Sequence, residues 1–273
     1  SPRKLRKSHT GFAMRIQNQL SPIGATFLDV GFDGVDCDVN AIIGLVGVQN
    51  PFWINRFYNQ GTIGGDLYLT ISSLVFKGVI DNGKVYITRD AGAEPRFLFD
   101  NSASLFTNKF PHIIVDAHME MNTISDNQVI MGTRFFGGGN IRTQGWRNAG
   151  GGQRKGVFRD NNGIHFANPA MASDTLGNPT DTSVWSFKKR ASDGLGVIDR
   201  KTYYNAAPDT QYLTSVVPLD WTNNSVNYNA FNTISSGDAW KVGNTWRDLF
   251  IFQEEQTLLV QNAIVDDIAN YYG

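Results

Sequence analysis

The amino-acid sequence predicts one all-β domain, a sandwich of two sheets that spans residues 1–273. Short runs rich in Val, Ile, Phe, Tyr and Thr recur along the chain, and these side chains suit a pleated, half-buried surface. Gly, Asn, Asp and Pro separate the runs at close spacing, which is typical of sandwiches rather than of alternating strands and helices. Hydrophobic residues make up 41% of the chain and aromatic residues 12%, enough for a substantial core.

The clearest strand predictions follow from these runs. In chain order they are Phe12–Gln17, Phe27–Phe32, Val85–Thr88, Arg96–Phe99, Ile113–Met119, Val129–Phe135, Val184–Lys188, Tyr212–Val217 and Trp246–Phe252. Around the fifth run apolar and polar residues alternate, so successive side chains fall on opposite faces of the strand. One face holds Val115, Ala117, Met119 and Met121. The other face, which we expect to meet solvent or a groove, holds Asp116, His118 and Glu120.

Two segments have helical periodicity. In Asp38–Val48 the first residue can cap the helix, and the apolar face is formed by Ala41, Ile42, Leu45 and Val46. In Glu254–Tyr272 apolar residues recur every four or seven positions: Val260, Ile264 and Ile268, and Leu258, Val265 and Tyr272. Glu254 and Glu255 near its start suit the positive end of the helix dipole. We expect this second segment to be a packing helix.

Glycine-rich segments interrupt the middle of the chain. Gly137–Asn140 and Gly150–Gly152 bracket a polar stretch that contains Trp146, and Asn161–Asp181 is rich in turn residues. Because glycine triplets weaken strands and supply positive-φ turns, we expect long surface loops here. Neither glycine run matches a phosphate-binding loop. No repeat or linker divides the chain, so we expect one domain with a basic N-terminal arm at residues 1–10.

Charge and hydropathy argue against two classes of partner. The chain has 24 Lys and Arg against 25 Asp and Glu, whereas duplex-binding proteins usually carry a basic excess, so we expect no nucleic-acid partner. One local basic cluster is an exception to this balance: Arg3, Lys4, Arg6 and Lys7. The cluster could touch an anionic partner, but we interpret it as a solvated arm. No apolar stretch of about 18 residues occurs, so no membrane span is expected. No apolar run follows the basic start, which is therefore not a predicted secretory signal.

Residues that bind metals or act as nucleophiles are scattered. The single cysteine, Cys37, can form no intrachain disulfide, and we interpret it as a small buried residue rather than a nucleophile. The spacing of Asp33, Asp36 and Asp38 does not fit an EF-hand loop. No His-Glu-x-x-His motif or Gly-x-Ser-x-Gly elbow occurs, and the histidines are His9, His112, His118 and His165. The sequence therefore predicts no metal site and no cofactor.

The order of several motifs resembles a known family. The opening Arg3–Ile16 resembles the RKLR-x-x-x-x-G-x-A-x-R-(V/I) start of arabinofuranosidase-B-type modules, which recur in phage tail and virion proteins. Their DIGF strand is similar to Phe27–Phe32, and their short helix to Asp36–Asp38 with Ala41–Gly47. Their WYDQSGNG segment is similar to Arg56–Gly61, with Asn59 in place of Asp, and their QPR step to Glu94–Phe97. The end of the last helix, Ala269–Gly273, is similar to the closing helix of many concanavalin A-like domains. The resemblance covers roughly the first hundred residues and this helix, and it implies a concanavalin A-like two-sheet jelly roll.

The resemblance also bears on catalysis. Its enzymes remove arabinofuranose with retention, which needs two carboxyl groups about 5–5.5 Å apart. Their nucleophilic Glu follows a Cys-Cys pair that this chain lacks, and the comparable stretch Val129–Asn140 contains no Asp or Glu. Asp238, in the dipeptide Gly237-Asp238, resembles the acid/base Asp of these enzymes. The nearest spare carboxylate is Glu120, which we interpret as part of a polar strand face. One carboxylate cannot perform a double displacement, so we do not expect hydrolysis.

A glycan site on a sandwich would combine aromatic platforms with amides and carboxylates. The candidate ligand-binding residues are Trp146, Trp221, Asn223, Asp238 and Trp240. Trp185 is a further tryptophan that could serve, whereas Trp53 and Trp246 lie in apolar strands and are predicted to be core residues.

Together these patterns predict a non-catalytic phage virion module, such as a tail-fibre, receptor-binding or capsid-decoration domain at the virion surface or outside the cell. Its expected partners are other virion subunits, a host cell-surface glycan and further copies of the chain. Two alternatives stay open. One is a diverged glycoside hydrolase using Asp238 with Glu120, and the other is a purely structural virion subunit.

Overall fold

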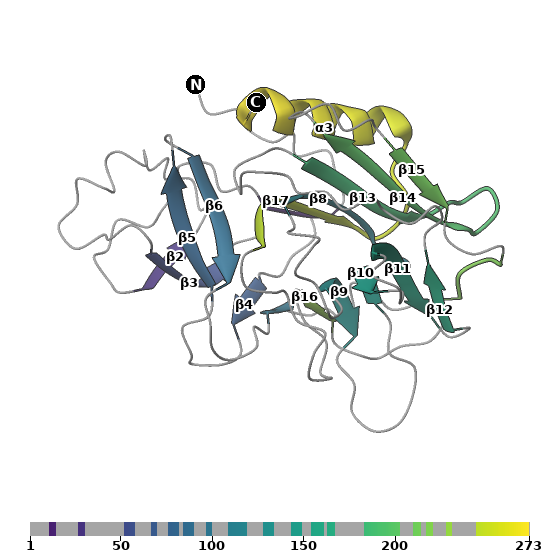
Figure 1. The fold of residues 1–273 in the computed structure, drawn as a ribbon, viewed down its shortest axis with the longest axis horizontal. Helices are drawn as coiled ribbons and strands as arrows, with labels where there is room; N and C mark the ends of the chain where they lie inside the picture. Colours follow the sequence, from purple (N-terminus) through teal and green to yellow (C-terminus); the bar gives the residue numbers. More distant parts are fainter. Residues whose placement is uncertain are drawn as a thin grey trace.

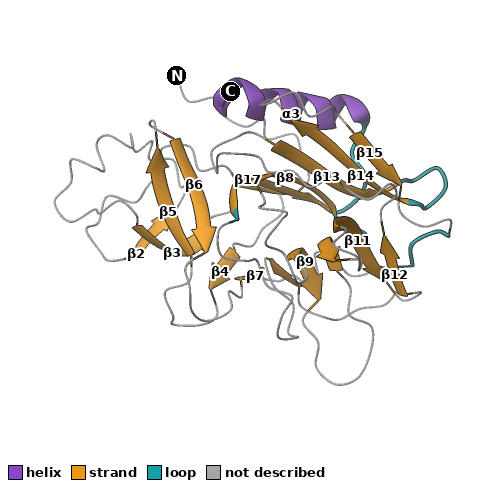
Figure 2. Cartoon of the chain, viewed as in Figure 1, coloured by secondary structure: helices purple, strands orange, loops and turns teal. Residues whose placement is uncertain are grey.

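The protein is described from a computed structural model, which places these residues: 11–14, 27–30, 52–57, 67–69, 76–81, 84–89, 97–99, 109–118, 128–133, 143–148, 154–160, 163–166, 183–202, 210–213, 217–220, 228–230 and 244–272. This part of the chain is mostly β-strand in antiparallel sheets, with one C-terminal helix, α3 (Figure 1, Figure 2). The predicted all-β class with a helix at the C-terminus is therefore confirmed. Among these residues, no helix has the length and apolar character needed to cross a membrane.

The elements are as follows. They are β1 (Gly11–Met14), β2 (Phe27–Val30), β3 (Phe52–Phe57), β4 (Leu67–Leu69), β5 (Phe76–Asp81), β6 (Lys84–Arg89), β7 (Phe97–Phe99), β8 (His112–His118), β9 (Gln128–Thr133), β10 (Thr143–Asn148), β11 (Arg154–Asp160), β12 (Gly163–Phe166), β13 (Ser183–Lys189), β14 (Gly196–Thr202), β15 (Thr210–Leu213), β16 (Tyr228–Ala230), β17 (Thr245–Phe252) and α3 (Leu258–Tyr272).

One group of strands lies beneath α3. Antiparallel pairing joins them in the order β1-β17-β8-β13-β14-β15. The helix covers one face of this group (Figure 1). A second group is joined in the order β12-β11-β10-β9-β16-β7-β4-β3, also antiparallel. Strand β3 pairs further with β5 and, in parallel, with β2, and the β5–β6 pair reaches β17 where Ile87 faces Trp246.

Aromatic side chains fill the space between the two groups. The ring of Trp146 on β10 meets Trp185 and Phe187 of β13 edge-on, with centroids 5.2 and 5.0 Å apart. Phe158 of β11 packs against Phe187 at 6.1 Å and against Phe110 at 5.5 Å. Such T-shaped contacts are favourable beyond the area they bury. Facing strand groups with an aromatic interior are consistent with the predicted sandwich.

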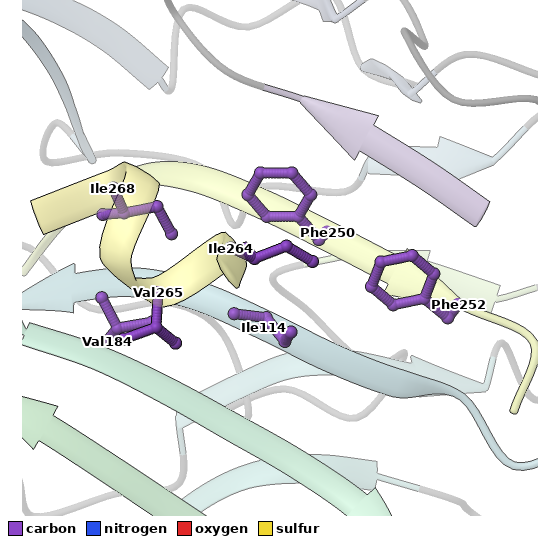
Figure 3. Close-up of a cluster of buried hydrophobic side chains, with 7 residues drawn as sticks. All are labelled: Ile114, Val184, Phe250, Phe252, Ile264, Val265 and Ile268. Carbon is purple, nitrogen blue, oxygen red and sulfur yellow. The ribbon is translucent and has the colours of Figure 1, made fainter. Parts of the chain in front are cut away.

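The opposite face of the same strands packs against α3. Three helix residues, Ile264, Val265 and Ile268, form a buried cluster with strand residues from β8, β13 and β17 (Figure 3): Ile114, Val184, Phe250 and Phe252. Helical positions i, i+1 and i+4 place the three side chains on one side of α3. Burying each such side chain stabilises the fold by about 1.5–3 kcal/mol. The prediction of a packing helix is confirmed.

Strands β8 and β13 are thus covered on both faces. Every residue of β8 from His112 to His118 is buried. The prediction that Asp116 and His118 meet solvent or a groove is therefore wrong, because the sequence alternation does not reveal that polar side chains pair inside the protein. On β13, Trp185 and Phe187 point into the aromatic interior, while Val184, Ser186 and Lys188 point toward α3.

Several predicted boundaries need correction. The helix begins at Leu258, four residues after the predicted start, because Thr257 caps it: its Oγ1 accepts a hydrogen bond from the N–H of Val260 at 3.4 Å. Of the first predicted strand, residues 12–14 lie in β1, and residues 15–17 are outside the described residues. Val217 lies in a bend outside β15.

The surface loops predicted around Trp146 and within 161–181 contain strands β10 and β12, because Gln144, Trp146 and His165 bury their side chains there. The helix predicted at 38–48 and Cys37 lie outside the described residues.

Candidate functional site

A pocket of about 840 Å³ lies where β13 and β14 meet the N-terminal half of α3. Ser186 of β13 is paired with Asp199 of β14, and side chains two residues apart share a face, so Lys188 and Lys201 border the same space. Residues 255–257, just before the helix, form the rim. The wall includes three apolar side chains, Val184, Leu258 and Val265. Its principal polar groups come from Lys188, Asp199, Glu255, Gln256, Gln261 and Asn262.

The ammonium group of Lys188 organises the polar wall. Lys188 as a residue is 6% exposed, and its Nζ donates a hydrogen bond to Oε1 of Gln261 at 2.8 Å. It also lies 3.2 Å from Oδ2 of Asp199 and 4.0 Å from Oε1 of Glu255. The amide of Gln261 in turn donates to Oδ2 of Asp199 at 3.0 Å. A buried cation is tolerated only when opposite charge and hydrogen bonds replace its water, and these three partners do so.

The rim is attached to the turn between β13 and β14. The carboxylate of Glu255 accepts a hydrogen bond from the backbone N–H of Ala191 at 2.7 Å. Within the turn, Gly194 has φ +74°, and a Cβ there would lie 2.9 Å from Cβ of Pro218. Arg190 also forms a salt bridge with Asp193. Glu255, predicted to serve the helix dipole, therefore binds the turn between β13 and β14 instead.

A buried histidine, His112, binds the backbone of the rim. Nδ1 of His112 accepts a hydrogen bond from the backbone N–H of Gln256 at 3.0 Å, and Nε2 lies 2.8 Å from Oγ of Ser186. Burial, reinforced by the nearby Lys188 cation, lowers the pKa of His112 from 6.5 to about 3. The imidazole is therefore neutral at pH 7. Because its Nδ1 is an acceptor, the proton sits on Nε2 and is donated to Ser186.

This proton position decides what the pair can do. A histidine that activates a serine must accept the hydroxyl proton through an unprotonated nitrogen. Here the nitrogen facing Ser186 already carries a proton, and the other nitrogen is occupied by the Gln256 amide. The His112–Ser186 contact at 2.8 Å therefore positions the rim and does not create a nucleophile.

A second polar cluster is formed by side chains of the neighbouring strands β8 and β17. Nε of Arg247 donates to Oδ2 of Asp116 at 2.7 Å, and the two side chains are 5% and 1% exposed. Burial, then the Arg247 and Arg200 cations, lower the pKa of His118 to about 4. Asp116 thus serves as a counter-charge. Among the described residues, no group of three or more His, Cys, Asp or Glu could hold a metal ion.

A third cluster fastens the hairpin β11–β12. Oδ1 of Asp160 lies 2.7 Å from Nε2 of His165 and accepts the Gly163 N–H at 3.1 Å. Its Oδ2 accepts the N–H of Asp220 at 2.6 Å. The carboxylate thereby ties together both ends of the hairpin turn and the segment 217–220. We interpret this cluster as structural.

Of the predicted catalytic and ligand-binding residues, the structure describes Trp146 alone. Trp146 is 1% exposed, so its ring packs in the aromatic interior and cannot serve as an exposed glycan platform. Trp185 is buried in the same interior, and the core position predicted for Trp246 is confirmed. The remaining candidates lie outside the described residues: Glu120, Trp221, Asn223, Asp238 and Trp240.

Sequence reasoning missed the pocket residues. Alternation in β13 does place Ser186 and Lys188 on one face, which was a usable signal. However, Lys188 and Gln261 are 73 residues apart, and no local pattern shows that they meet.

No family model matches the sequence, and no curated protein matches it. Among solved structures, a protein of unknown function from Shewanella oneidensis MR-1 is similar, with a TM-score of 0.42 and 10% sequence identity. The alignment covers 77% of this chain and 90% of that one. The likeness is too distant to indicate a shared fold or function.

Proposed function

We propose that this protein is a non-catalytic phage virion module, a tail-fibre, receptor-binding or capsid-decoration domain, that binds a host cell-surface glycan. In this proposal the strands form a concanavalin A-like jelly roll. The partners are other virion subunits and the glycan, and the location is the virion surface. The phage origin and the jelly roll rest on the resemblance of residues 3–16 and the segments that follow it to arabinofuranosidase-B-type modules.

One observation supports binding over catalysis: the hydrogen-bonded arrangement of His112 between Gln256 and Ser186. General acid–base catalysis requires a group that exchanges a proton near the working pH. The pKa of His112 is about 3, and both of its ring nitrogens are already in hydrogen bonds. The site therefore offers fixed hydrogen-bonding groups beside an apolar wall, which is what recognition of a small polar ligand needs.

A purely structural virion subunit is the second candidate. It is favoured by two consecutive leucines at the start of α3, Leu258 and Leu259, which are 62% and 80% exposed. Exposed apolar side chains that lie together often mark contacts between subunits. In that case the contacts of the protein would be with other virion proteins alone.

The test is a glycan-array assay on the purified domain, followed by incubation with each bound glycan and analysis for cleavage. We expect binding with the glycan recovered intact. Cleavage that disappears in Asp238→Ala would contradict the proposal and establish a diverged hydrolase. The absence of binding and of cleavage would instead support the structural subunit.

A further inference from the structure

We infer that the pocket between β13, β14 and α3 binds a neutral, polyhydroxylated ligand of one or two sugar units. This inference rests on the proposed glycan-binding function and gives it a site. The pocket volume of about 840 Å³ lies within the range of about 300–1,000 Å³ that small-ligand sites occupy. Of the aromatic residues considered from the sequence, the three whose side chains the structure describes do not line it: Trp146, Trp185 and Trp246.

The charge balance of the pocket favours a neutral ligand. Lys188 is matched by Asp199 at 3.2 Å and by Glu255 at 4.0 Å. At the edge, Lys201 is matched by Asp266 at 3.5 Å. A third described cation of the lining, Arg200, has its guanidinium 5.0 Å from the centre of the Trp185 ring, on the aromatic side of β14. An anionic ligand would approach two carboxylates, and a cationic one would approach the buried ammonium.

The lining also favours hydroxyl groups over apolar surface. A sugar hydroxyl donates one hydrogen bond and accepts others, and the pocket presents both kinds of partner: carboxylates from Asp199 and Glu255, and the Asn262 amide. An apolar ligand would displace water from these charged groups without replacing its hydrogen bonds, which is costly. Val184 and Leu258 offer surface for the C–H face of a sugar ring.

The polar groups are held in place before a ligand arrives. Glu255 is fixed by the Ala191 N–H at 2.7 Å, the Gln256 backbone by His112 at 3.0 Å, and Gln261 by Lys188 at 2.8 Å. A ligand that enters therefore orders few protein groups, and less of the binding free energy is lost to conformational entropy.

The experiment uses the full chain and saturation-transfer NMR with arabinose, galactose, glucose, mannose and N-acetylglucosamine, their disaccharides, and every array-bound glycan. Dissociation constants are then measured for three variants. Asn262→Trp fills the mouth of the pocket from an exposed helix position. Glu255→Gln keeps an acceptor for the Ala191 N–H but removes the charge. Asn270→Trp is the matched control, an exposed asparagine of the same helix that does not line the pocket.

We expect Asn262→Trp and Glu255→Gln each to weaken binding about tenfold or more, since charge-assisted hydrogen bonds are strong, and Asn270→Trp to bind like the wild type. A glycan bound equally well by all three variants would overturn the inference and leave the proposed function standing. Binding of anionic glycans alone would overturn the neutral ligand class. Failure of every glycan to bind the wild type would overturn the proposed function and the inference together.

Discussion

The backbone N–H of Gln256 donates a hydrogen bond to Nδ1 of His112, at 3.0 Å and across 144 residues of sequence. This contact connects the segment before α3 to the central strand β8. It also fixes the proton of the imidazole on Nε2, where it faces Ser186. One backbone hydrogen bond thus both shapes the rim of the pocket and prevents the histidine from acting as a base toward the serine.

Acid should destabilise the protein through its two buried histidines. Their pKa values fall from 6.5 to about 3 for His112 and about 4 for His118 on folding, so the unfolded chain binds more protons below pH 6.5. Their contribution to stability is therefore complete above about pH 6.5 and is lost progressively as the pH falls, down to about 4 for His118 and about 3 for His112. The slope is up to about 1.4 kcal/mol per pH unit for each group.

The measurement is the free energy of unfolding in urea at several pH values between 8 and 4, for the wild type and for His112→Gln. Other acidic groups titrate in both proteins, so the difference between the two curves isolates His112. We expect a shallower decline in the variant. Parallel curves would show that His112 is not buried as a neutral group.

The Asp116–Arg247 pair should behave as a buried ion pair. Removing one charge with Asp116→Asn leaves the Arg247 guanidinium without its carboxylate in the interior, which typically costs about 3–5 kcal/mol. The double variant Asp116→Leu with Arg247→Met should lose less stability than the sum of the single variants, because it buries no unpaired charge. Urea unfolding measures this for the wild type, Asp116→Asn, Asp116→Leu, Arg247→Met and the double variant. A loss below about 1 kcal/mol for Asp116→Asn would indicate an exposed pair instead.

The attachment of α3 can be tested by paired substitutions on opposite sides of the helix. Ile268 is fully buried against the sheet, and its replacement by Ala should cost about 2–5 kcal/mol. Leu259 is 80% exposed, and Leu259→Ala should change stability by less than about 0.5 kcal/mol. Thermal or urea unfolding gives both values. Equal effects at the two positions would contradict the orientation of the helix seen in Figure 3.

Local sequence patterns predicted the elements better than their partners. Short runs of strand-forming residues located β8, β13 and β17, and the four-residue spacing of Val260, Ile264 and Ile268 located α3. These signals depend on neighbouring residues in one element. The start of the helix was misplaced because two acidic residues suggested a dipole partner, whereas the threonine at 257 was the actual cap.

The candidate site was harder to predict because its residues come from distant segments. In the sequence Lys188 has the character of a solvated residue at the end of a strand. In the structure its ammonium group contacts Gln261 and Asp199. Trp146 was placed in a loop because glycine triplets flank it, and the aromatic partners that bury it lie on β13. Whether a side chain is buried or exposed depends on which strands pair and which faces become covered. The local periodicity of one sequence does not show either.

The most direct test of whether this site binds or reacts is the protonation state of His112, observed by nitrogen-15 NMR of the imidazole ring. The signal is assigned by its loss in His112→Gln. We predict a neutral ring with the proton on Nε2, unchanged between pH 8 and about 5, as expected from a pKa of about 3. A ring that titrates near pH 6.5, or carries its proton on Nδ1, would leave Nε2 free to accept the Ser186 proton, and would contradict a non-catalytic role for this pair.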